Sequence, residues 1–390
     1  MEWKKQTRDY TTSAAGTVPR HGRAGCAHGA GVGLDTRAFH EWLHPLVDIL
    51  SRCEAGRRVP MEMRGGRYTA AMNRLFRDAA GSCLAPGGSV VCVGAFDGVH
   101  RGHQALLAQT RARASASGMA AVAISFEPIP REFFARGEPV ARLSGVREKI
   151  ERIFAAGIDT LLVLRFDARM ASMSAESFVE DILVSRAGAR EIRVGEDFRF
   201  GRAREGDVDR LRVLGRRHGF AVDVMPDVGH GADRASSSTI RRQLAAGDFE
   251  GAASMLGRPF AIGGRVVRGL QLGRRLGWPT ANLRLGRRVS PVCGIFAVRV
   301  RGVTATSRPG VASLGMRPTV GGTEPLLEVH LFDFDGDLYG RRIEVEFVRK
   351  LRDESKFDDL DAMVRQIERD AAEARMTLGT PIPRERAATV

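Results

Sequence analysis

Short apolar runs alternate with stretches of helical periodicity between residues 89 and 225, and this alternation constrains the fold more than any other feature. We expect strands at residues 89–95, 120–126, 160–166, 191–195 and 220–225. Helices are expected at residues 146–156, 175–187 and 209–218, with another beginning near Gly102. Strands that alternate with helices predict an α/β fold whose parallel sheet is covered on both faces. Residues 240–255 then predict one or two helices that close this module.

The pattern changes after Gly257, where short alternating segments are separated by Gly, Pro and Asp turns. These segments are residues 263–267, 294–301, 310–314, 327–332 and 342–347. They predict an antiparallel β-barrel. Residues 358–375 carry helically spaced apolar residues and predict an amphipathic helix packed on the barrel. The 390 residues therefore divide into a module at 72–256, a module at 257–378 and a tail at 379–390.

Residues 1–71 differ from the rest, with a Gly/Ala-rich run and no alternation. Only residues 39–50 could form a short amphipathic helix. Four histidines here (His21, His28, His40 and His44) lack metal-ligand spacing. We interpret this stretch as a disordered extension, or as upstream sequence read from a start placed too early. Met61, Met63 and Met72 are then alternative starts.

The net charge of +14 favours an anionic ligand. Only five of the 60 basic residues are lysines, an arginine excess that a GC-rich coding bias would produce, so a phosphate-bearing small molecule is expected before nucleic acid. A nucleic-acid-binding protein remains an alternative, which salt-sensitive RNA binding would support. No apolar run is long enough for a membrane helix, and no membrane partner is expected. Five scattered cysteines without a CxxC pair fit a cytoplasmic protein.

The segment FDGVHRGH at residues 96–103 lies where the first strand passes into the first helix. His100 and His103 are three residues apart and share one helix face. The unpaired N–H groups of a helix's first turn attract polyphosphate. Gly94, Gly98 and Gly102 let the backbone approach such a ligand. The alternative is a glycine-rich turn with two incidental histidines.

A second basic segment, SSSTIR at residues 236–241, would complete such a site. Its hydroxyls suit a helix cap, and Arg241 lies in the first helical turn. Alone, this pattern is usually only a cap. Together with HxGH it indicates a site that stabilises a departing pyrophosphate.

The segment GRVVRGLQLGRRLGWPTAN at residues 264–282 is a basic loop with repeated glycines. Its glycines permit this loop to fold as a flap over the phosphates of a ligand. Thr280 and Asn282 offer the hard oxygen ligands of a Mg²⁺-nucleotide. On a later strand Glu328, His330 and Phe332 share one face, and Glu328 could accept a proton from an attacking hydroxyl. Otherwise Glu328 is an ordinary solvent-side glutamate.

Residues from Met72 to about Arg375 resemble the bacterial bifunctional riboflavin kinase/FMN adenylyltransferases, the prokaryotic FAD synthetases. The resemblance runs in order through both modules. It rests on GAFDGVHRGHQ (94–104), SFEPIPREFF (125–134), VGEDFRFG with RxGD (194–207), SSSTIR (236–241), GRRLGWPTANL (273–283), GVASLGMRPTV (310–320), EVHLFDFDGDLYG (328–340) and LRDESKF (351–357). It implies a Rossmann-like HxGH nucleotidyltransferase domain followed by a riboflavin kinase barrel with a C-terminal helix.

The resemblance also implies two reactions, both using ATP and Mg²⁺, with Mn²⁺ a possible substitute. The barrel module would phosphorylate riboflavin to FMN with Glu328 as general base. The first module would adenylylate FMN to FAD, with His100, His103 and Arg241 acting on the triphosphate. Implied nucleotide-binding residues are Gly94, Phe96, Asp97, Gly102, Ser237, Thr239, Gly269, Gly273, Thr280 and Asn282, with Thr280 and Asn282 also holding the metal. Implied flavin-binding residues are Asp197, Arg204 and Arg352, and flavoproteins would receive the product.

Two positions depart from the family pattern. Ala95 stands where the family usually has Asn, and Ile129 where it usually has His. A lost hydrogen bond costs about 1–3 kcal/mol, or about tenfold to a hundredfold in rate. A riboflavin kinase with an impaired adenylyl module is therefore a further alternative.

Overall fold

A computed structural model of the chain describes residues 73–381, apart from residues 78, 136–138, 227–228, 231–232, 270–271, 287 and 320–321. The extension expected over residues 1–71, its helix at residues 39–50 and the alternative starts lie outside the described residues. Residues 382–390 of the expected tail lie outside them as well.

The first module is built on a six-stranded sheet whose neighbouring strands are all parallel. Its strands are β1 (Arg74–Phe76), β2 (Ser89–Val93), β3 (Ala120–Glu127), β4 (Thr160–Arg165), β5 (Ala189–Gly195) and β6 (Ala221–Met225). They lie in the order β1-β4-β3-β2-β5-β6. This confirms the predicted parallel α/β fold and adds the edge strand β1, which the sequence pattern did not predict.

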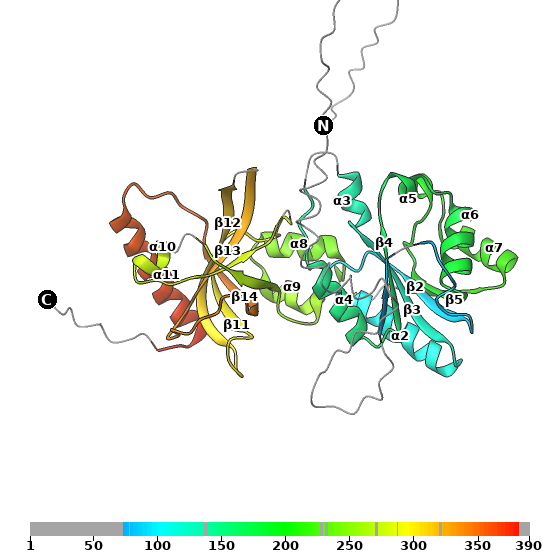
Figure 1. Cartoon of the computed structure of the whole chain (residues 1–390), viewed down its shortest axis with the longest axis horizontal. Coiled ribbons are helices and arrows are strands. Elements are labelled where there is room, and N and C mark those ends of the chain that lie inside the picture. Colours follow the sequence, from blue (N-terminus) through cyan, green and yellow to red (C-terminus); the bar gives the residue numbers. More distant parts are fainter. Residues whose placement is uncertain are drawn as a thin grey trace, which may run out of the picture. The chain divides into compact units, whose positions relative to one another are not determined.

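Helices cover both faces of this sheet, because its strands are apolar on both sides. In β2, Val90 and Cys92 belong to one buried cluster, and Val91 and Val93 to another. Helices α2 (Arg101–Ala116) and α4 (Val146–Ala155) contribute to the first cluster (Figure 1). The second includes residues of α7 (Val208–His218) and of the π-helix η1 (Phe178–Arg186).

Several short elements connect these layers. They are α3 (Pro130–Phe134), α5 (Ala168–Ser172), α6 (Ala175–Ser177), the 3₁₀ turn η2 (Arg202–Arg204), and the paired strands β7 (Gly229–His230) and β8 (Asp233–Arg234). The α-helix expected at residues 175–187 is thus a short α6 followed by η1.

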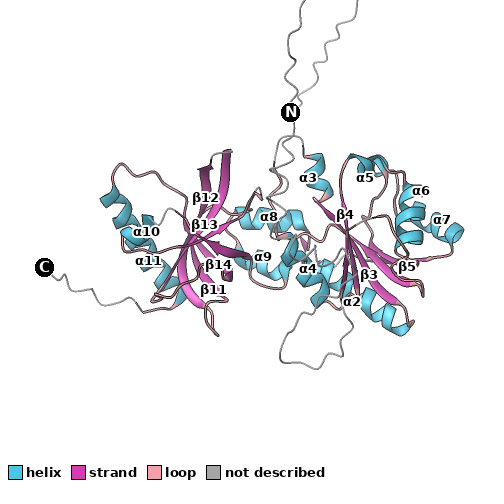
Figure 2. Ribbon diagram, viewed as in Figure 1, coloured by secondary structure: helices cyan, strands magenta, loops and turns pink. Residues whose placement is uncertain are grey.

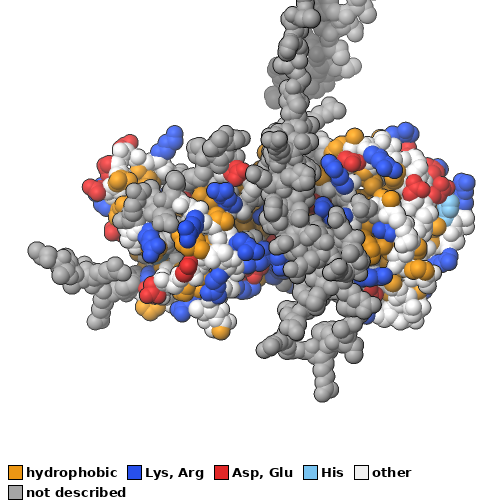
Figure 3. Space-filling model, viewed as in Figure 1, with side chains coloured by type: hydrophobic (Ala, Val, Ile, Leu, Met, Phe, Trp, Pro, Cys, Tyr) orange, Lys and Arg blue, Asp and Glu red, His pale blue; other side chains and the backbone are white. Residues whose placement is uncertain are grey.

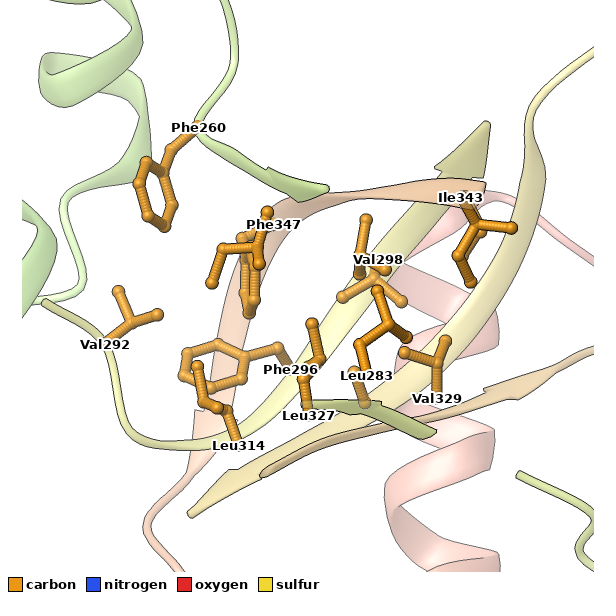
Figure 4. Close-up of a cluster of buried hydrophobic side chains, with 14 of the residues drawn as sticks. Phe260, Leu283, Val292, Phe296, Val298, Leu314, Leu327, Val329, Ile343 and Phe347 are labelled. Carbon is orange, nitrogen blue, oxygen red and sulfur yellow. The ribbon is translucent and has the colours of Figure 1, made fainter. Parts of the chain in front are cut away.

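The second module is a closed antiparallel barrel, as expected (Figure 2). Its strands are β9 (Ala261–Val267), β10 (Ala281–Arg284), β11 (Gly294–Arg301), β12 (Arg308–Thr319), β13 (Gly322–Leu331) and β14 (Arg342–Arg352). They close in the order β10-β13-β12-β11-β14-β9. Strand β10 was not predicted. Figure 4 shows the apolar core, in which Phe296, Leu327 and Phe347 are all buried.

Helix α11 (Leu360–Leu378) packs on the barrel's outer surface, as expected, but it does so through its C-terminal half, and Leu360 at its start is 58% exposed. Its residues Ala371, Ala374 and Leu378 form a buried cluster with Ile295 and Ala297 of β11. The neighbouring Phe296 and Val298 belong instead to the inner cluster. The period of two in β11 therefore separates the barrel interior from the surface under α11.

Two helices before the barrel share its apolar core. They are α8 (Ser237–Ala245) and α9 (Phe249–Leu256), which ends at the left-handed Gly257. Ile240, Leu244 and Phe249 belong to the same buried cluster as Phe296. The Phe249 ring lies 6.0 Å from the Phe296 ring. One or two helices were expected at residues 240–255 to close the first module; two are present, and their apolar residues belong to the buried cluster of the barrel.

Basic side chains are spread over the visible surface of the described residues, with acidic groups among them (Figure 3). Within the described part of the chain, no helix combines the length and apolarity needed to cross a bilayer.

Candidate active sites

The turn between β2 and α2 has an unusual backbone. Phe96, Gly98 and Val99 all have positive φ values, of 50°, 79° and 42°. Only glycine adopts this region without cost, and a β-branched valine there is an outlier. A Cβ at Gly98 would lie 2.9 Å from the Leu143 Cβ atom. Surrounding packing holds the turn in this shape, and such strain clusters at functional sites.

The two histidines of this turn lie face to face at the start of α2. His100 is the N-cap residue, and its ring centroid is 3.7 Å from that of His103 at an interplanar angle of 24°. Burial of the ring lowers the pKa of His103 well below its ordinary value, and the charges of His100 and Lys149 lower it further. The first turn of α2 contains no acidic residue. A neutral imidazole and open helical N–H groups are therefore available to an anionic ligand.

Asp97 joins this turn to helix α8. Its side chain, 2% exposed, accepts bonds from the backbone N–H groups of Leu143 and Ser144, each at 3.2 Å. Arg241 Nη2 donates to Asp97 Oδ2 at 2.5 Å, and Arg241 Nε donates to the Ala141 carbonyl at 2.5 Å. The structure thus brings Arg241 to the histidine turn, and burial lowers its pKa.

The serine run meets the same turn. Ser236 caps α8 by accepting from the Thr239 N–H at 3.1 Å, and Ser237 Oγ donates to the Asp97 carbonyl at 3.0 Å. A Cβ at Gly102 would lie 3.7 Å from the Ala235 carbonyl. The N-termini of α2 and α8 therefore lie together, as the pairing of the two sequence segments predicted.

A buried charge network, not predicted from the sequence, lies beside the turn. Arg142 pairs with Glu127 and, at 2.5 Å, with Glu132. Lys149 is 1% exposed and donates to Glu127 at 3.1 Å and to the Phe126 carbonyl at 2.9 Å. Burial lowers the pKa of Lys149. The network ties α4 to the carboxyl end of β3.

The two departures from the family pattern lie at the ends of β2 and β3. The Ala95 carbonyl accepts from Ser125 Oγ at 3.2 Å and from Lys149 Nζ at 3.4 Å. Ile129 is buried, and its N–H donates to the Glu132 carboxylate at 3.2 Å. The backbone at both positions is thus held in place, although neither side chain offers a polar group.

An aromatic cluster follows β3 and β4 at the same sheet edge. Phe133 and Phe134 are 39% and 59% exposed, and their rings lie 5.4 Å and 5.7 Å from the Phe166 ring. Exposed aromatics of this kind are available to a flat apolar ligand. The sequence pattern did not predict this cluster, although the Phe133–Phe134 pair shortly after a predicted strand was a signal for it.

Asp197 and Arg204 lie between β5 and α7, and both are exposed. Strand β5 neighbours β2, so residues after the two strands meet at one edge of the parallel sheet. Ala203 and Arg204 have positive φ values of 52° and 63°. Their role in binding flavin stays a prediction.

The predicted residues of the barrel site also come together. Asn282 of β10 is the register partner of Glu328 of β13. The Asn282 side chain is buried, and its Nδ2 donates to the Thr280 carbonyl at 3.4 Å. A Cβ at Gly269 would lie 2.9 Å from the Asn282 side chain. Glu328, Asn282, Thr280 and Gly269 therefore form one cluster.

The flap that leads to this cluster includes α10 (Leu272–Arg275) and is tightly folded. A Cβ at Gly273 would lie 2.3 Å from the Trp278 carbonyl oxygen, and the Trp278 N–H donates to the Gly273 carbonyl at 2.7 Å. Gly277 between them has a φ of +83°. Glycine is required at both positions for this path.

Arg352, which was expected to bind flavin, forms two hydrogen bonds with a carboxylate of α11. Its Nε and Nη2 donate to the Asp370 carboxylate at 2.8 Å and 2.6 Å, and Asp370 is 5% exposed. This pair fixes α11 to the end of β14. Contact of Arg352 with flavin stays a prediction.

Comparisons with known proteins match both modules. The FAD synthetase family model matches residues 84–239, and the riboflavin kinase family model matches residues 256–378. A protein of Escherichia coli (strain K12), named bifunctional riboflavin kinase/FMN adenylyltransferase, is 44% identical over 296 residues, covering 76% of this chain and 95% of that protein. A Pseudomonas fluorescens protein of the same name is 47% identical, covering 74% of this chain and 92% of its own length.

A crystal structure described as a macrolide-efflux protein from Streptococcus pneumoniae matches with a TM-score of 0.65 and 29% sequence identity. The match covers 77% of this chain and 98% of that one. Because the coverage exceeds either module, the similarity extends over parts of both folds.

Proposed function

The chain belongs to the bifunctional riboflavin kinase/FMN adenylyltransferase family, and we propose that its two reactions run at the two clusters described above. The chain phosphorylates riboflavin to FMN with ATP and adenylylates FMN to FAD with a second ATP. The proposal assigns residues 257–378 to the first reaction and residues 72–256 to the second. The observation that carries it is that the two clusters lie in different modules. Glu328 and Asn282 are register partners on neighbouring strands of the barrel, whereas Arg241 donates to Asp97 of the histidine turn.

In the barrel, Glu328 accepts the proton of the ribityl 5′-hydroxyl as that oxygen attacks the γ-phosphorus of ATP. A carboxylate contributes to such general-base catalysis when it lies within hydrogen-bond reach of the hydroxyl. Asn282 and Thr280 orient the phosphates beside Glu328, and the flap glycines Gly269 and Gly273 let the backbone lie close to them. ADP leaves as the bond between the β–γ bridging oxygen and the γ-phosphorus breaks.

Magnesium fits the side chains of this cluster. Thr280, Asn282 and Glu328 offer a hydroxyl, an amide oxygen and a carboxylate, which are the oxygen donors that Mg²⁺ prefers. Thr280 and Asn282 would hold the ion, which supplies charge neutralisation for the phosphates. Mn²⁺ suits the same donors.

In the first module, an oxygen of the FMN phosphate attacks the α-phosphorus of ATP, and the bond to the β-phosphate breaks to release pyrophosphate. The α2 N-terminus with His100 and His103 binds the triphosphate, and Arg241 stabilises charge on the pyrophosphate. Asp97 orients Arg241 through the bond at 2.5 Å. Gly94, Phe96, Gly102, Ser237 and Thr239 form the nucleotide-binding turn and cap.

For the flavin of this reaction, the exposed rings of Phe133 and Phe134 offer the stacking surface, since a flat apolar ring prefers aromatic faces. Asp197 and Arg204 contribute from the neighbouring strand end. Arg352 serves flavin in the barrel module, held in place by its Nε and Nη2 bonds to Asp370 and its Nη1 bond to the Asp353 carbonyl.

The enzyme works in the cytoplasm, and flavoproteins bind the FAD and FMN that it produces. The thiols of Cys83, Cys92 and Cys293 are free among the described residues, which suits a reducing compartment.

The test is incubation of the purified protein with riboflavin, ATP and Mg²⁺, followed by chromatography of the flavins over time. FMN that rises and then yields FAD is expected. FMN without FAD would favour the alternative that Ala95 and Ile129 motivate, a kinase with an impaired adenylyl module. No flavin product would refute the proposal.

A further inference from the structure

His330 lies in the barrel site but takes no direct part in the steps proposed for the two reactions. It follows Glu328 by two residues on β13, so the two side chains share the face opposite to the buried Leu327, Val329 and Leu331. The neighbouring strand β10 begins at Ala281, which pairs with Val329. The residues before Ala281 are therefore beyond the β10–β13 ladder, on the side where His330 lies.

The His330 side chain contacts the segment just beyond the end of this ladder. Its Nδ1 atom lies 2.9 Å from the Pro279 carbonyl oxygen. A carbonyl oxygen only accepts, so Nδ1 carries the proton in this bond. The ring also meets the Trp278 ring edge-on, with centroids 4.9 Å apart. Both contacts fall on the segment that leads directly to Thr280 and Asn282.

The His330 ring also lies next to Phe332. The Phe332 ring lies 5.9 Å from it, and the Arg375 guanidinium of α11 lies 4.2 Å from the Phe332 centroid. Arg375 donates to both oxygens of Asp333 at 3.0 Å and 2.8 Å. A chain of contacts thus runs from α11 through Phe332 and His330 to the flap.

The state of the ring suits a fixed hydrogen-bond donor. Burial lowers the pKa of His330, the bond to Pro279 opposes this, Arg375 lowers the pKa and Asp333 raises it. The net direction is downward, so the ring is neutral near pH 7. A neutral Nδ1–H imidazole keeps this bond without introducing a cation beside Glu328.

We propose that His330 is a positioning residue for riboflavin phosphorylation, which latches the segment Trp278–Pro279 to strand β13 so that Thr280 and Asn282 face Glu328. This inference rests on the proposed kinase function of the barrel. Because the latch acts before and during the reaction alike, its loss weakens ATP binding and leaves the chemical step nearly intact.

The test compares His330→Leu and His330→Asn in the full chain. Asparagine carries an N–H donor at about the position of Nδ1, whereas leucine has none. We expect His330→Leu to raise KM for ATP in riboflavin phosphorylation about tenfold, or ~1.4 kcal/mol, with kcat within about twofold. His330→Asn is expected within about threefold of the original enzyme. FMN adenylylation by the same preparations should be unchanged, and His218→Leu in the first module is the matched control.

An unchanged KM in His330→Leu, or equal damage in both variants, would overturn the inference while riboflavin phosphorylation by the unaltered chain still stands. No FMN from the unaltered chain would instead refute the proposed function. A second measurement decides the matter if His330→Leu fails to fold. Nitrogen-15 NMR of the unaltered protein should show His330 as the neutral Nδ1–H tautomer, and an Nε2–H tautomer overturns the latch.

Discussion

Replacement of Asp97 by Asn tests the ion pair that connects α2 to α8. Asp97 and Arg241 side chains are 2% and 13% exposed, and Asp97 also accepts from Leu143 and Ser144. Asparagine keeps one acceptor oxygen but loses the charge, so Arg241 remains buried without its anion. Removal of one partner from a buried pair costs about 3–5 kcal/mol. Arg241 retains its bond to the Ala141 carbonyl, so we expect about 3 kcal/mol.

The assay is scanning calorimetry together with both enzyme activities. A loss of about 3 kcal/mol lowers the midpoint of a module of this size by roughly 6–12 °C. FMN adenylylation should fall because Arg241 is no longer oriented, whereas riboflavin phosphorylation should persist below the transition. Asp159→Asn is the control, since its pair with Arg111 is 25% and 41% exposed and such pairs contribute about 1 kcal/mol or less. The reasoning is refuted if Asp97→Asn costs less than about 1 kcal/mol, or no more than Asp159→Asn.

Three further predictions concern single side chains. Glu328→Gln should lower riboflavin phosphorylation by about a hundredfold or more and spare FMN adenylylation, and His103→Ala should do the reverse; loss of both activities in a folded variant would contradict two separate sites. Gly273→Ala should raise the kinase KM for ATP about tenfold, because the new Cβ would lie 2.3 Å from the Trp278 carbonyl, and steady-state kinetics with unchanged KM would refute the required close approach. The lowered pKa of His103 means that the unfolded chain binds a proton below about pH 6.5 that the folded chain does not. Stability should therefore fall on acidification, by up to about 1.4 kcal/mol per pH unit for this group, and thermal unfolding of His103→Gln should show a correspondingly flatter dependence between pH 7.5 and 5.5.

The sequence predicted the parts of the fold that follow local patterns. Strand β2 is buried on both faces and so reads as a continuous apolar run. Strands β1 and β10 have three and four residues, too few for a period to appear. The register of β1 is set by pairing of Arg74 with Thr160, far along the chain. Element bounds that depend on such distant pairing were therefore missed.

The same distinction applies to the candidate sites. The histidine turn was predicted because strand, glycine turn and helix are consecutive in the chain. The Asp97–Arg241 pair joins residues 144 positions apart, and no local pattern specifies it. The cluster of Phe133, Phe134 and Phe166 likewise depends on two different strand ends that meet at one edge of the sheet.

The nine residues of helix α8 contribute both to the first active site and to the buried cluster of the barrel. Arg241 points its guanidinium to Asp97, whereas Ile240 and Leu244 belong to the buried cluster that also contains Phe249 and the barrel residue Phe296. A gene cut after residue 256 would thus produce a fragment with an uncovered apolar surface on the helix that carries Arg241, and a barrel that lacks Phe249 in its core. A stand-alone adenylyltransferase derived from this sequence would need polar replacements at Ile240, Leu244 and Phe249. The packing of α8 and α9 against the barrel core therefore favours keeping the two activities in one chain.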